Sequence, residues 1–375
     1  MAEQLVPAEL LRKADKILFV AHLALGDFTY MQNCFRAFRQ AYPHIRMDLW
    51  VDEVRRTSDA SQWEHLSKYA LYDWVRACGM FGRIYDQTYS PKGYASSIEQ
   101  ARAEDYPIVV SFAVLRRHLY AELIRKLSPR GFVVGQKKRV RLLDIRKHLA
   151  YRKLDAFIPA YVAKGQDQHI SAIYAGWFES LFGLQMAAGE RFPYIDMPSQ
   201  WLQRARADLE AQGIAADAPL VFLNAFSKSE ERSWPLQRMV ELAGRMRALP
   251  QWQDAHFILN VVPEKLEQAR AVIAADQSGR LHLFSAQENF FQLPAVLSLC
   301  RLIISVETAV MHLANAVRVP VIALMRQTSP EWTPIDAASS TILTVKTRKG
   351  WLTEITTDEV IDLLQRTTVS TVREF

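Results

Sequence analysis

The sequence predicts an α/β protein of two domains, each built from parallel strands that alternate with helices. Its 375 residues suffice for two domains of ordinary size, each with its own core. Half of the residues are hydrophobic and 23% are charged, which is the balance of a globular chain and not of a disordered one. Strand–helix–strand patterns occur at residues 16–51 and 301–325, and such units require a parallel sheet with right-handed crossovers.

The first half opens with a buried strand, Lys16–His22, followed by a turn over Leu23–Asp27 and a helix that continues to Gln40. The other elements expected in this half are the strands Ile45–Val51, Arg83–Tyr85, Ile108–Ala113 and Gly131–Val134 and the helix Ile170–Leu184. Polar residues and two prolines mark Met186–Pro198 as the connection between domains. We therefore expect domains at residues 1–190 and 191–350, and a C-terminal helical segment, 351–375, that braces the first domain.

Four strand–helix alternations follow in the second half. The expected strands are Leu220–Ala225, His256–Val261, Leu281–Phe284, Leu302–Val306 and Val321–Met325. The expected helices are Ser199–Gln212, Leu236–Ala248, Lys265–Ala275, Phe290–Leu299, a short helix with Thr308 as its N-cap, and Thr356–Arg366.

Polar side chains at the end of the strand Leu302–Val306 mark one candidate site. In open α/β sheets, ligands bind beyond the carboxyl ends of the strands, near helix N-termini that attract anions. Glu307 and Thr308 occupy such a position, with His312 one helical turn further, and we interpret them as half of a nucleotide-diphosphate pocket. A carboxylate there needs partners, and sugar or ribose hydroxyls are suitable ones. Glu264 follows the preceding strand in the same way, whereas the apolar neighbours of His312 slightly favour an ordinary core histidine.

Two further positions carry candidate chemistry. The loop after Leu220–Ala225 contains hydroxyls and cations that suit a diphosphate, although an ordinary solvated loop has a similar composition. These residues are Ser227, Lys228, Ser229 and Arg232. Asp27, at the start of the first long helix, is a candidate general base if an acceptor hydroxyl lies within hydrogen-bond reach, and a helix cap otherwise.

A basic segment lies between residues 137 and 153, where eight lysines and arginines face a single acid, Asp144. It is either a solvated surface or a basic lip that binds a phosphorylated or membrane-borne acceptor. Nucleic acid is the weaker prediction, because no recognised nucleic-acid module accompanies the segment. The residues assigned to acceptor binding are Lys137, Lys138, Arg139 and Arg141.

Several function classes lose support. The sequence contains no GxGxxG, P-loop, HExxH or GxSxG motif. Cys34, Cys78 and Cys300 are scattered and lack metal-ligand spacing, which fits reduced cytosolic thiols. We expect a cytoplasmic protein, because neither a signal peptide nor an apolar run of membrane-spanning length occurs. A peripheral contact at the inner face of the inner membrane is an option, and the net charge of +6 could favour an anionic partner.

Three blocks of sequence resemble the heptosyltransferases of glycosyltransferase family 9, which build lipopolysaccharide core. The first block, residues 16–51, contains that family's LGD turn after the opening strand. The second contains RSWP, similar to the family's basic-x-Trp-Pro helix start. The third contains SVETAVMHLANA, similar to the family's S-x-D-T-G-x-x-H-x-A-x-A signature.

The resemblance implies a GT-B architecture, in which two Rossmann-like domains face each other across a cleft. It implies inverting transfer of a heptose from a nucleotide diphosphate, typically ADP-L-glycero-D-manno-heptose, to a lipopolysaccharide core acceptor, without a metal or other cofactor. Asp27 falls on the family's proposed base, and Arg232 on the basic residue that neutralises the leaving diphosphate. The residues matched to donor binding are Ser227, Lys228, Glu264, Glu307, Thr308 and His312.

The chain also departs from the family pattern. Glu307 replaces the usual aspartate, Ala309 replaces the usual glycine, and Met325–Thr328 replaces a glycine-containing turn. These changes leave the donor sugar open. The alternatives are a nucleotide-sugar epimerase or hydrolase on the same scaffold, and a non-catalytic protein that binds nucleotides or glycans.

Overall fold

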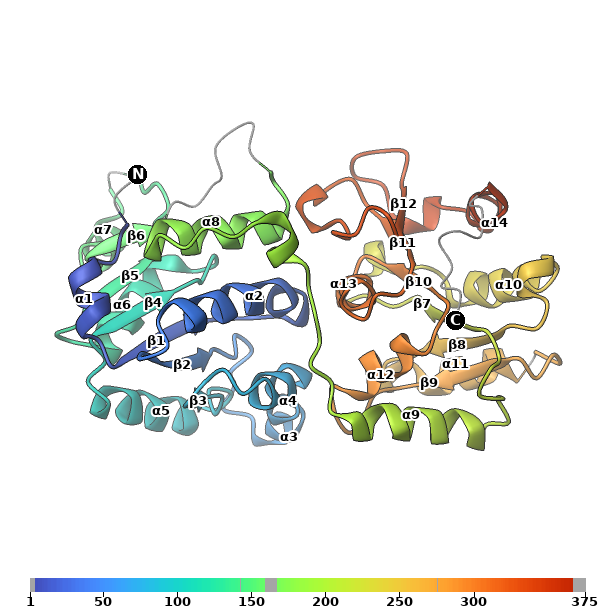
Figure 1. Ribbon diagram of the computed structural model, residues 1–375, viewed down its shortest axis with the longest axis horizontal. Coiled ribbons are helices and arrows are strands. Elements are labelled where there is room, and N and C mark those ends of the chain that lie inside the picture. Colours follow the sequence, from blue (N-terminus) through green and yellow to red (C-terminus); the bar gives the residue numbers. More distant parts are fainter. Residues whose placement is uncertain (1–3, 142, 159–166, 275, 367–375) are drawn as a thin grey trace. The chain divides into compact units, whose positions relative to one another are not determined.

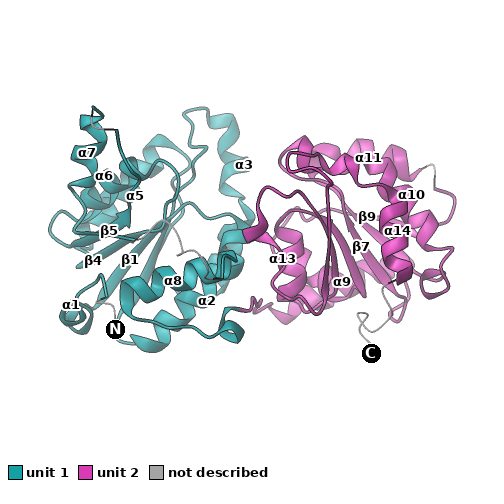
Figure 2. Cartoon of the chain, turned by 90° about the horizontal axis from the view of Figure 1, so that it is seen from above, with its two compact units in different colours: residues 1–191 teal, residues 192–375 magenta. Residues whose placement is uncertain are grey.

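The computed structural model describes residues 4–141, 143–158, 167–274 and 276–366, and the chain in it forms two compact units. Unit 1 comprises residues 1–191 and unit 2 comprises residues 192–375 (Figures 1 and 2). The junction between Arg191 and Phe192 falls inside the segment Met186–Pro198. Within the described ranges, no helix has both the length and the hydropathy that a membrane span requires.

Unit 1 contains one six-stranded parallel sheet with the order β3-β2-β1-β4-β5-β6. Its strands are β1 (Lys16–Ala21), β2 (Arg46–Val51), β3 (Ile84–Tyr85), β4 (Ile108–Ser111), β5 (Phe132–Gln136) and β6 (Ala156–Ile158). Its helices are α1 (Ala8–Lys13), α2 (Leu25–Ala41), α3 (Trp63–Ser67), α4 (Ala70–Ala77), α5 (Pro91–Ala103), α6 (Arg117–Leu127), α7 (Ile145–Tyr151) and α8 (Ile170–Phe182).

An aromatic cluster holds α2 and α8 against β1. The ring of Phe19 on β1 lies 5.1 Å from that of Phe35 on α2 and 6.0 Å from that of Phe178 on α8. Phe38 and Phe182 complete the contact between the two helices at 4.7 Å. Aromatic pairs contribute about 0.5–1.5 kcal/mol each beyond the area that they bury. The cluster therefore fixes α2 and α8 side by side, as Figure 1 shows.

Unit 2 contains a second six-stranded parallel sheet, with the order β12-β11-β10-β7-β8-β9. Its strands are β7 (Leu220–Asn224), β8 (His256–Asn260), β9 (Leu281–Phe284), β10 (Leu302–Val306), β11 (Val321–Met325) and β12 (Ser340–Thr344). Its helices are α9 (Ser199–Ala211), α10 (Leu236–Met246), α11 (Leu266–Ile273), α12 (Gln292–Ser298), α13 (Ala309–Ala316) and α14 (Thr357–Arg366).

The central strands β7, β10 and β11 are buried along their whole length. Continuous apolar runs of this kind are typical of parallel strands that are covered by helices on both faces. The two α/β units of parallel sheet agree with the fold class that the sequence predicts, and they fit the GT-B architecture that the resemblance implies.

The last helix packs within unit 2. The apolar face of α14 packs on α10 in the core of unit 2, through Val360, Ile361 and Leu364. The helix therefore uses these apolar side chains within its own unit, and its role as a brace toward the first domain stays a prediction. Residues 367–375 of the expected segment lie outside the described residues.

Three elements differ from the prediction. The LGD sequence is the first turn of α2 and not a loop before it, because the helix begins at Leu25. Neither β6 nor β12 was expected. β6 has only three residues, and β12 is an edge strand with the mixed sequence STILT, so neither has the apolar run that identifies a buried strand.

The two sheets share one strand order. In each unit, the first and fourth strands are neighbours: β1 beside β4 in unit 1 and β7 beside β10 in unit 2. The chain winds in opposite directions from this point, and the crevice at the carboxyl ends of these two strands is the usual ligand position in open parallel sheets. Each unit therefore has one such position.

Candidate functional site

A buried amide network closes the carboxyl ends of β7, β8 and β10. The side-chain amide of Asn224, at the end of β7, donates to the hydroxyls of Ser305 and Thr308 at 3.0 Å each. Its oxygen accepts from Asn260 Nδ2 at 2.8 Å. Thr308 is the N-cap of α13, as predicted, and its Oγ1 accepts from the Val310 N–H at 3.3 Å. The network thus fixes the start of α13 at the ligand position of unit 2.

Glu307 adds a largely buried carboxylate at the same place, with its side chain only 7% exposed. Its Oε2 accepts from the Arg326 N–H at 3.0 Å, and its Oε1 lies 3.9 Å from Arg232 Nε. Burial raises the pKa of Glu307, whereas the Arg326 N–H and the two arginine charges oppose the increase. A buried carboxylate is stabilised by further hydrogen-bond donors, and sugar hydroxyls are donors of this kind.

Two arginines lie beside this carboxylate, Arg232 from the loop after β7 and Arg326 from directly after β11. Arg232 is 42% exposed, and its Nε donates to Ser229 Oγ at 3.0 Å. Arg326 Nη1 pairs with Glu231 at 2.7 Å, and its Nε donates to the Gly350 carbonyl at 2.9 Å. Arg326, which directly follows β11, therefore links the loop after β7 to the end of β11.

The remaining donor-site candidates occupy different environments. Ser227 is half-buried, and its N–H donates to Ser233 Oγ at 3.0 Å, whereas the neighbouring Lys228 is exposed. Glu264 is exposed in a short 3-10 helix after β8, one strand away from β7. His312 is buried on α13, with its ring 5.7 Å from that of Trp332. The loop candidates therefore lie at the carboxyl edge of the sheet, and His312 lies in packed surroundings behind it.

In unit 1, Asp27 lies at the carboxyl end of β1, on the first turn of α2. Its Oδ2 accepts from the Ala24 N–H at 2.9 Å, and its Oδ1 accepts from the Tyr174 hydroxyl at 2.6 Å. Tyr174 is buried on α8, and burial, together with the charge of Asp27, raises the pKa of its hydroxyl well above the ordinary value. The phenol therefore stays protonated and holds the carboxylate in one orientation.

Other polar side chains gather at the same edge of unit 1. Asp52, directly after β2, accepts from the Tyr120 hydroxyl at 2.6 Å and pairs with Arg56 at 3.2 Å. The ring of His22, directly after β1, lies 5.6 Å from that of Tyr120 in a tilted arrangement. Burial lowers the pKa of His22, and Arg116 adds to this effect, whereas Asp27 and Asp52 oppose it. These groups form a mixed polar surface beside Asp27 that suits a hydroxylated ligand.

The basic acceptor candidates are separate from Asp27 within unit 1. Lys137, Lys138, Arg139 and Arg141 are all exposed in the loop that follows β5, the second strand along from β1. The ammonium group of Lys137 lies 5.2 Å from the ring centroid of Phe157 on β6. The loop is at the carboxyl edge of the sheet, as the strand–helix order requires, but it lies toward the β6 end of that edge, away from β1.

Sequence reasoning missed Asn224, Asn260, Arg326 and Tyr174. The two asparagines had a signal, because each ends an apolar strand with an amide, in VFLN and FILN. Tyr174 had none, because its contact with Asp27 depends on how α8 packs against α2.

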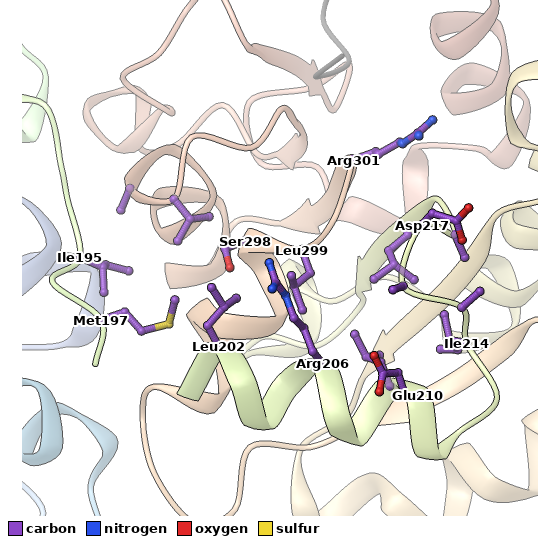
Figure 3. A pocket seen from close by; sticks show the side chains of 17 residues that line it. Ile195, Met197, Leu202, Arg206, Glu210, Ile214, Asp217, Ser298, Leu299 and Arg301 are labelled. Carbon is purple, nitrogen blue, oxygen red and sulfur yellow. The ribbon is translucent and has the colours of Figure 1, made fainter. Parts of the chain in front are cut away.

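A cavity of about 810 Å³ lies elsewhere in unit 2 (Figure 3). Leu220 at the start of β7 and Arg301 before β10 line it together with α9, so it opens at the amino edge of the sheet. None of the predicted site residues lines it. Within the described part of the chain, no group of three histidine, cysteine or acidic side chains is arranged to hold a metal ion.

Comparison with known proteins identifies the family. The model of glycosyltransferase family 9 (heptosyltransferase) matches residues 102–357, which is more than half of the chain. The chain belongs to glycosyltransferase family 9. It is accordingly a glycosyltransferase, and the unit 2 crevice with Glu307, Thr308 and Arg232 lies inside the matched region.

Solved structures agree on the fold of this family 9 glycosyltransferase. A family 9 glycosyltransferase from Veillonella parvula is similar with a TM-score of 0.69 at 16% identity, over 94% of this chain and 96% of that chain. Escherichia coli ADP-heptose lipopolysaccharide heptosyltransferase II gives a TM-score of 0.65 at 15% identity, over 93% and 97%. E. coli heptosyltransferase WaaC with ADP gives 0.62 at 17%, over 93% and 97%. Among curated proteins, no sequence matches this chain.

Proposed function

We propose that this glycosyltransferase moves a heptose, or a related sugar, from a nucleotide diphosphate to a lipopolysaccharide core or related glycan acceptor. The expected donor is ADP-heptose, and the transfer inverts the anomeric centre without a divalent metal. The observation that carries the proposal is the buried Glu307, 3.9 Å from Arg232, directly before the capped N-terminus of α13. WaaC, which shares the fold, was solved with ADP and with ADP-2-deoxy-2-fluoro heptose, and these ligands motivate the choice of donor.

On the donor side, a diphosphate would lie at the carboxyl edge of β7 and β10. Arg232, Lys228 and the hydroxyl of Ser227 would contact its oxygens, and the positive end of α13 would add to the field. Glu307 would accept hydrogen bonds from sugar hydroxyls, and Glu264 would do so from the ribose. Charge that develops on the departing diphosphate is the charge that such preorganised donors stabilise best.

On the acceptor side, Asp27 would remove the proton from the attacking hydroxyl. The acceptor oxygen forms a bond to the anomeric carbon while the bond from that carbon to the phosphate oxygen breaks. The electron pair leaves with the nucleotide diphosphate, and the proton stays on Asp27 until solvent takes it. A single displacement inverts the configuration and needs no covalent enzyme intermediate. Tyr174 would position Asp27, and Lys137, Lys138, Arg139 and Arg141 would attract an anionic acceptor.

Two departures from the family signature bear on the donor. Glu307 is one methylene longer than the usual aspartate, and Ala309 adds a Cβ at the start of α13. A shift of 1 Å at a reacting centre costs about a hundredfold in rate. A donor sugar that differs from the usual heptose in its hydroxyl pattern would be consistent with this longer acid.

The test combines binding and turnover. Calorimetric titration with ADP, UDP and GDP should favour ADP, and ADP-heptose should be consumed only when an acceptor is present. Asp27→Asn should lower kcat by about 10²–10⁴-fold, the usual contribution of a general base, with unchanged thermal unfolding. Near-normal transfer by this folded variant would exclude Asp27 as the base. Release of sugar at full rate without an acceptor would contradict transfer and indicate hydrolysis or epimerisation.

We also propose that the enzyme acts in the cytoplasm, in peripheral contact with the membrane that carries the acceptor. The motivation is the exposed basic loop after β5, together with the absence of a membrane-spanning helix from the described residues.

A further inference from the structure

Exposed apolar side chains are concentrated on one part of unit 1. Of the eleven exposed large hydrophobic side chains among the described residues, seven lie between positions 114 and 157. They are Val114, Leu115, Leu119, Leu143, Ile145, Leu149 and Phe157. A single exposed leucine needs no explanation, but a concentration of this kind marks an interaction surface.

Contacts between α6 and α7 bring these residues onto neighbouring elements. The two helices pack together and run in the same direction. Near their ends, Arg125 Nη2 donates to the Lys153 carbonyl at 2.9 Å. Near their starts, the charge of His118 on α6 acts on Asp144, the N-cap of α7. Figures 1 and 2 both show the two helices side by side on the outer part of the sheet.

The apolar side chains of α7 point away from the protein core. Ile145 and Leu149 are one helical turn apart, so they share a face, and they are 69% and 53% exposed. Leu143, just before the helix, is 92% exposed. Phe157 is 54% exposed on β6, the edge strand to which α7 leads. We call this set, with the lysines and arginines of residues 137–153, the apolar–basic surface.

The charge of this surface is strongly positive. Its eight basic residues face one acid, Asp144, and among the described residues only Lys147 of the eight pairs with a carboxylate, that of Asp144. The other seven cations form no ion pair within the described residues, so they are available to anions outside the protein. A surface that exposes leucines and unpaired cations together matches the interfacial region of an anionic bilayer, where acyl chains lie directly beneath phosphate headgroups.

We propose that the apolar–basic surface binds an anionic lipid bilayer, with Leu143, Ile145 and Leu149 inserted below the headgroups and the surrounding lysines and arginines at the phosphates. A second copy of the chain is a poorer occupant, because two such surfaces would repel each other. Nucleic acid would satisfy the cations but leave the leucines in water. The inference deepens the membrane contact of the proposed function, and it does not depend on which sugar is transferred.

The test measures binding of the full chain to vesicles, without donor or acceptor. The protein should sediment with vesicles of equal parts phosphatidylcholine and phosphatidylglycerol, and far less with phosphatidylcholine alone. The double variant Leu143→Ser with Ile145→Ser should bind about a hundredfold more weakly, since each buried leucine-sized side chain is worth roughly tenfold. Lys138→Glu with Arg139→Glu should weaken binding about twenty-fivefold at low salt, which is roughly fivefold for each cation lost.

Matched controls come from unit 2. Ile342→Ser removes an exposed apolar side chain, and Arg348→Glu with Lys349→Glu reverses an exposed basic pair, so both should leave vesicle binding unchanged. Circular dichroism checks that every variant is folded. Tryptophan or nitroxide labels at position 143 should report an apolar environment on binding.

Three results would overturn the inference. They are equal binding to neutral and anionic vesicles, unchanged binding of the leucine variant, and equal losses in the unit 2 controls. Its failure is distinguishable from failure of the proposed function. A chain that transfers heptose to a water-soluble acceptor but ignores vesicles refutes only the bilayer surface. One that binds vesicles through this surface but transfers no sugar refutes only the proposed reaction.

Discussion

Asn224→Ala tests whether the buried amide network stabilises the carboxyl edge of the unit 2 sheet. The substitution removes three hydrogen bonds, two donated to Ser305 and Thr308 and one accepted from Asn260. Each neutral bond contributes about 1 kcal/mol net, and the partners left behind are largely shielded from water, so we expect a loss of about 2–4 kcal/mol in the free energy of unfolding. Asn260→Ala removes only one of these bonds and should lose about 1 kcal/mol.

Urea unfolding followed by far-UV circular dichroism gives both free energies by linear extrapolation. Calorimetry should also show weaker ADP binding to Asn224→Ala, because the N-cap of α13 loses a donor. The reasoning fails if Asn224→Ala is less destabilising than Asn260→Ala. It also fails if the loss stays below about 0.5 kcal/mol, the range of ordinary surface substitutions.

Three more predictions follow from other contacts. Tyr174→Phe should lower kcat by about ten- to a hundredfold with little change in the KM for the sugar donor, because Asp27 loses the hydroxyl that orients it. Equal changes in kcat and KM would contradict this role. Burial lowers the pKa of His256 and of His282, whose ring nitrogens are 2.8 Å apart, so the unfolded chain binds more protons than the folded one. The free energy of unfolding should therefore fall as the pH drops through about 6.5. In urea unfolding at several pH values, His282→Gln should show a smaller dependence of stability on pH. The raised pKa of Glu307 has the opposite effect on stability, since the folded state binds this proton more readily and the free energy of unfolding falls as the pH rises above 4.5. Glu307→Gln should therefore be more stable than the natural protein at neutral pH, yet bind the sugar nucleotide more weakly. A loss of stability in this variant would refute the account.

Local sequence predicted the strands of unit 2 well, with the exception of β12. The strands Leu302–Val306 and Val321–Met325 have the bounds expected, because apolar runs between polar turns are decisive where helices cover both faces. The edge strand Leu281–Phe284 also has the bounds expected, since its sequence is a short apolar run. In contrast, β12 has half-buried polar residues at a sheet edge, so its pairing with β11 is not encoded in a local pattern.

The candidate site divides in the same way. Glu307 and Thr308 follow a strand directly, so their position at the crevice could be predicted from strand and helix order alone. Tyr174 lies 147 positions from Asp27, and the Arg326 side chain reaches Glu231 across 95 positions. Such contacts depend on tertiary packing, and no single sequence pattern contains them.

The common strand order has a consequence for how such enzymes diversify. Each crevice is formed by the ends of one sheet, with its own loops and its own supporting contacts. Under the proposed function, mutations that change the donor sugar could therefore accumulate around Glu307 while the surroundings of Asp27 stay constant, and the reverse would hold for the acceptor glycan. Donor choice and acceptor choice would then be inherited as two separately variable traits of one chain.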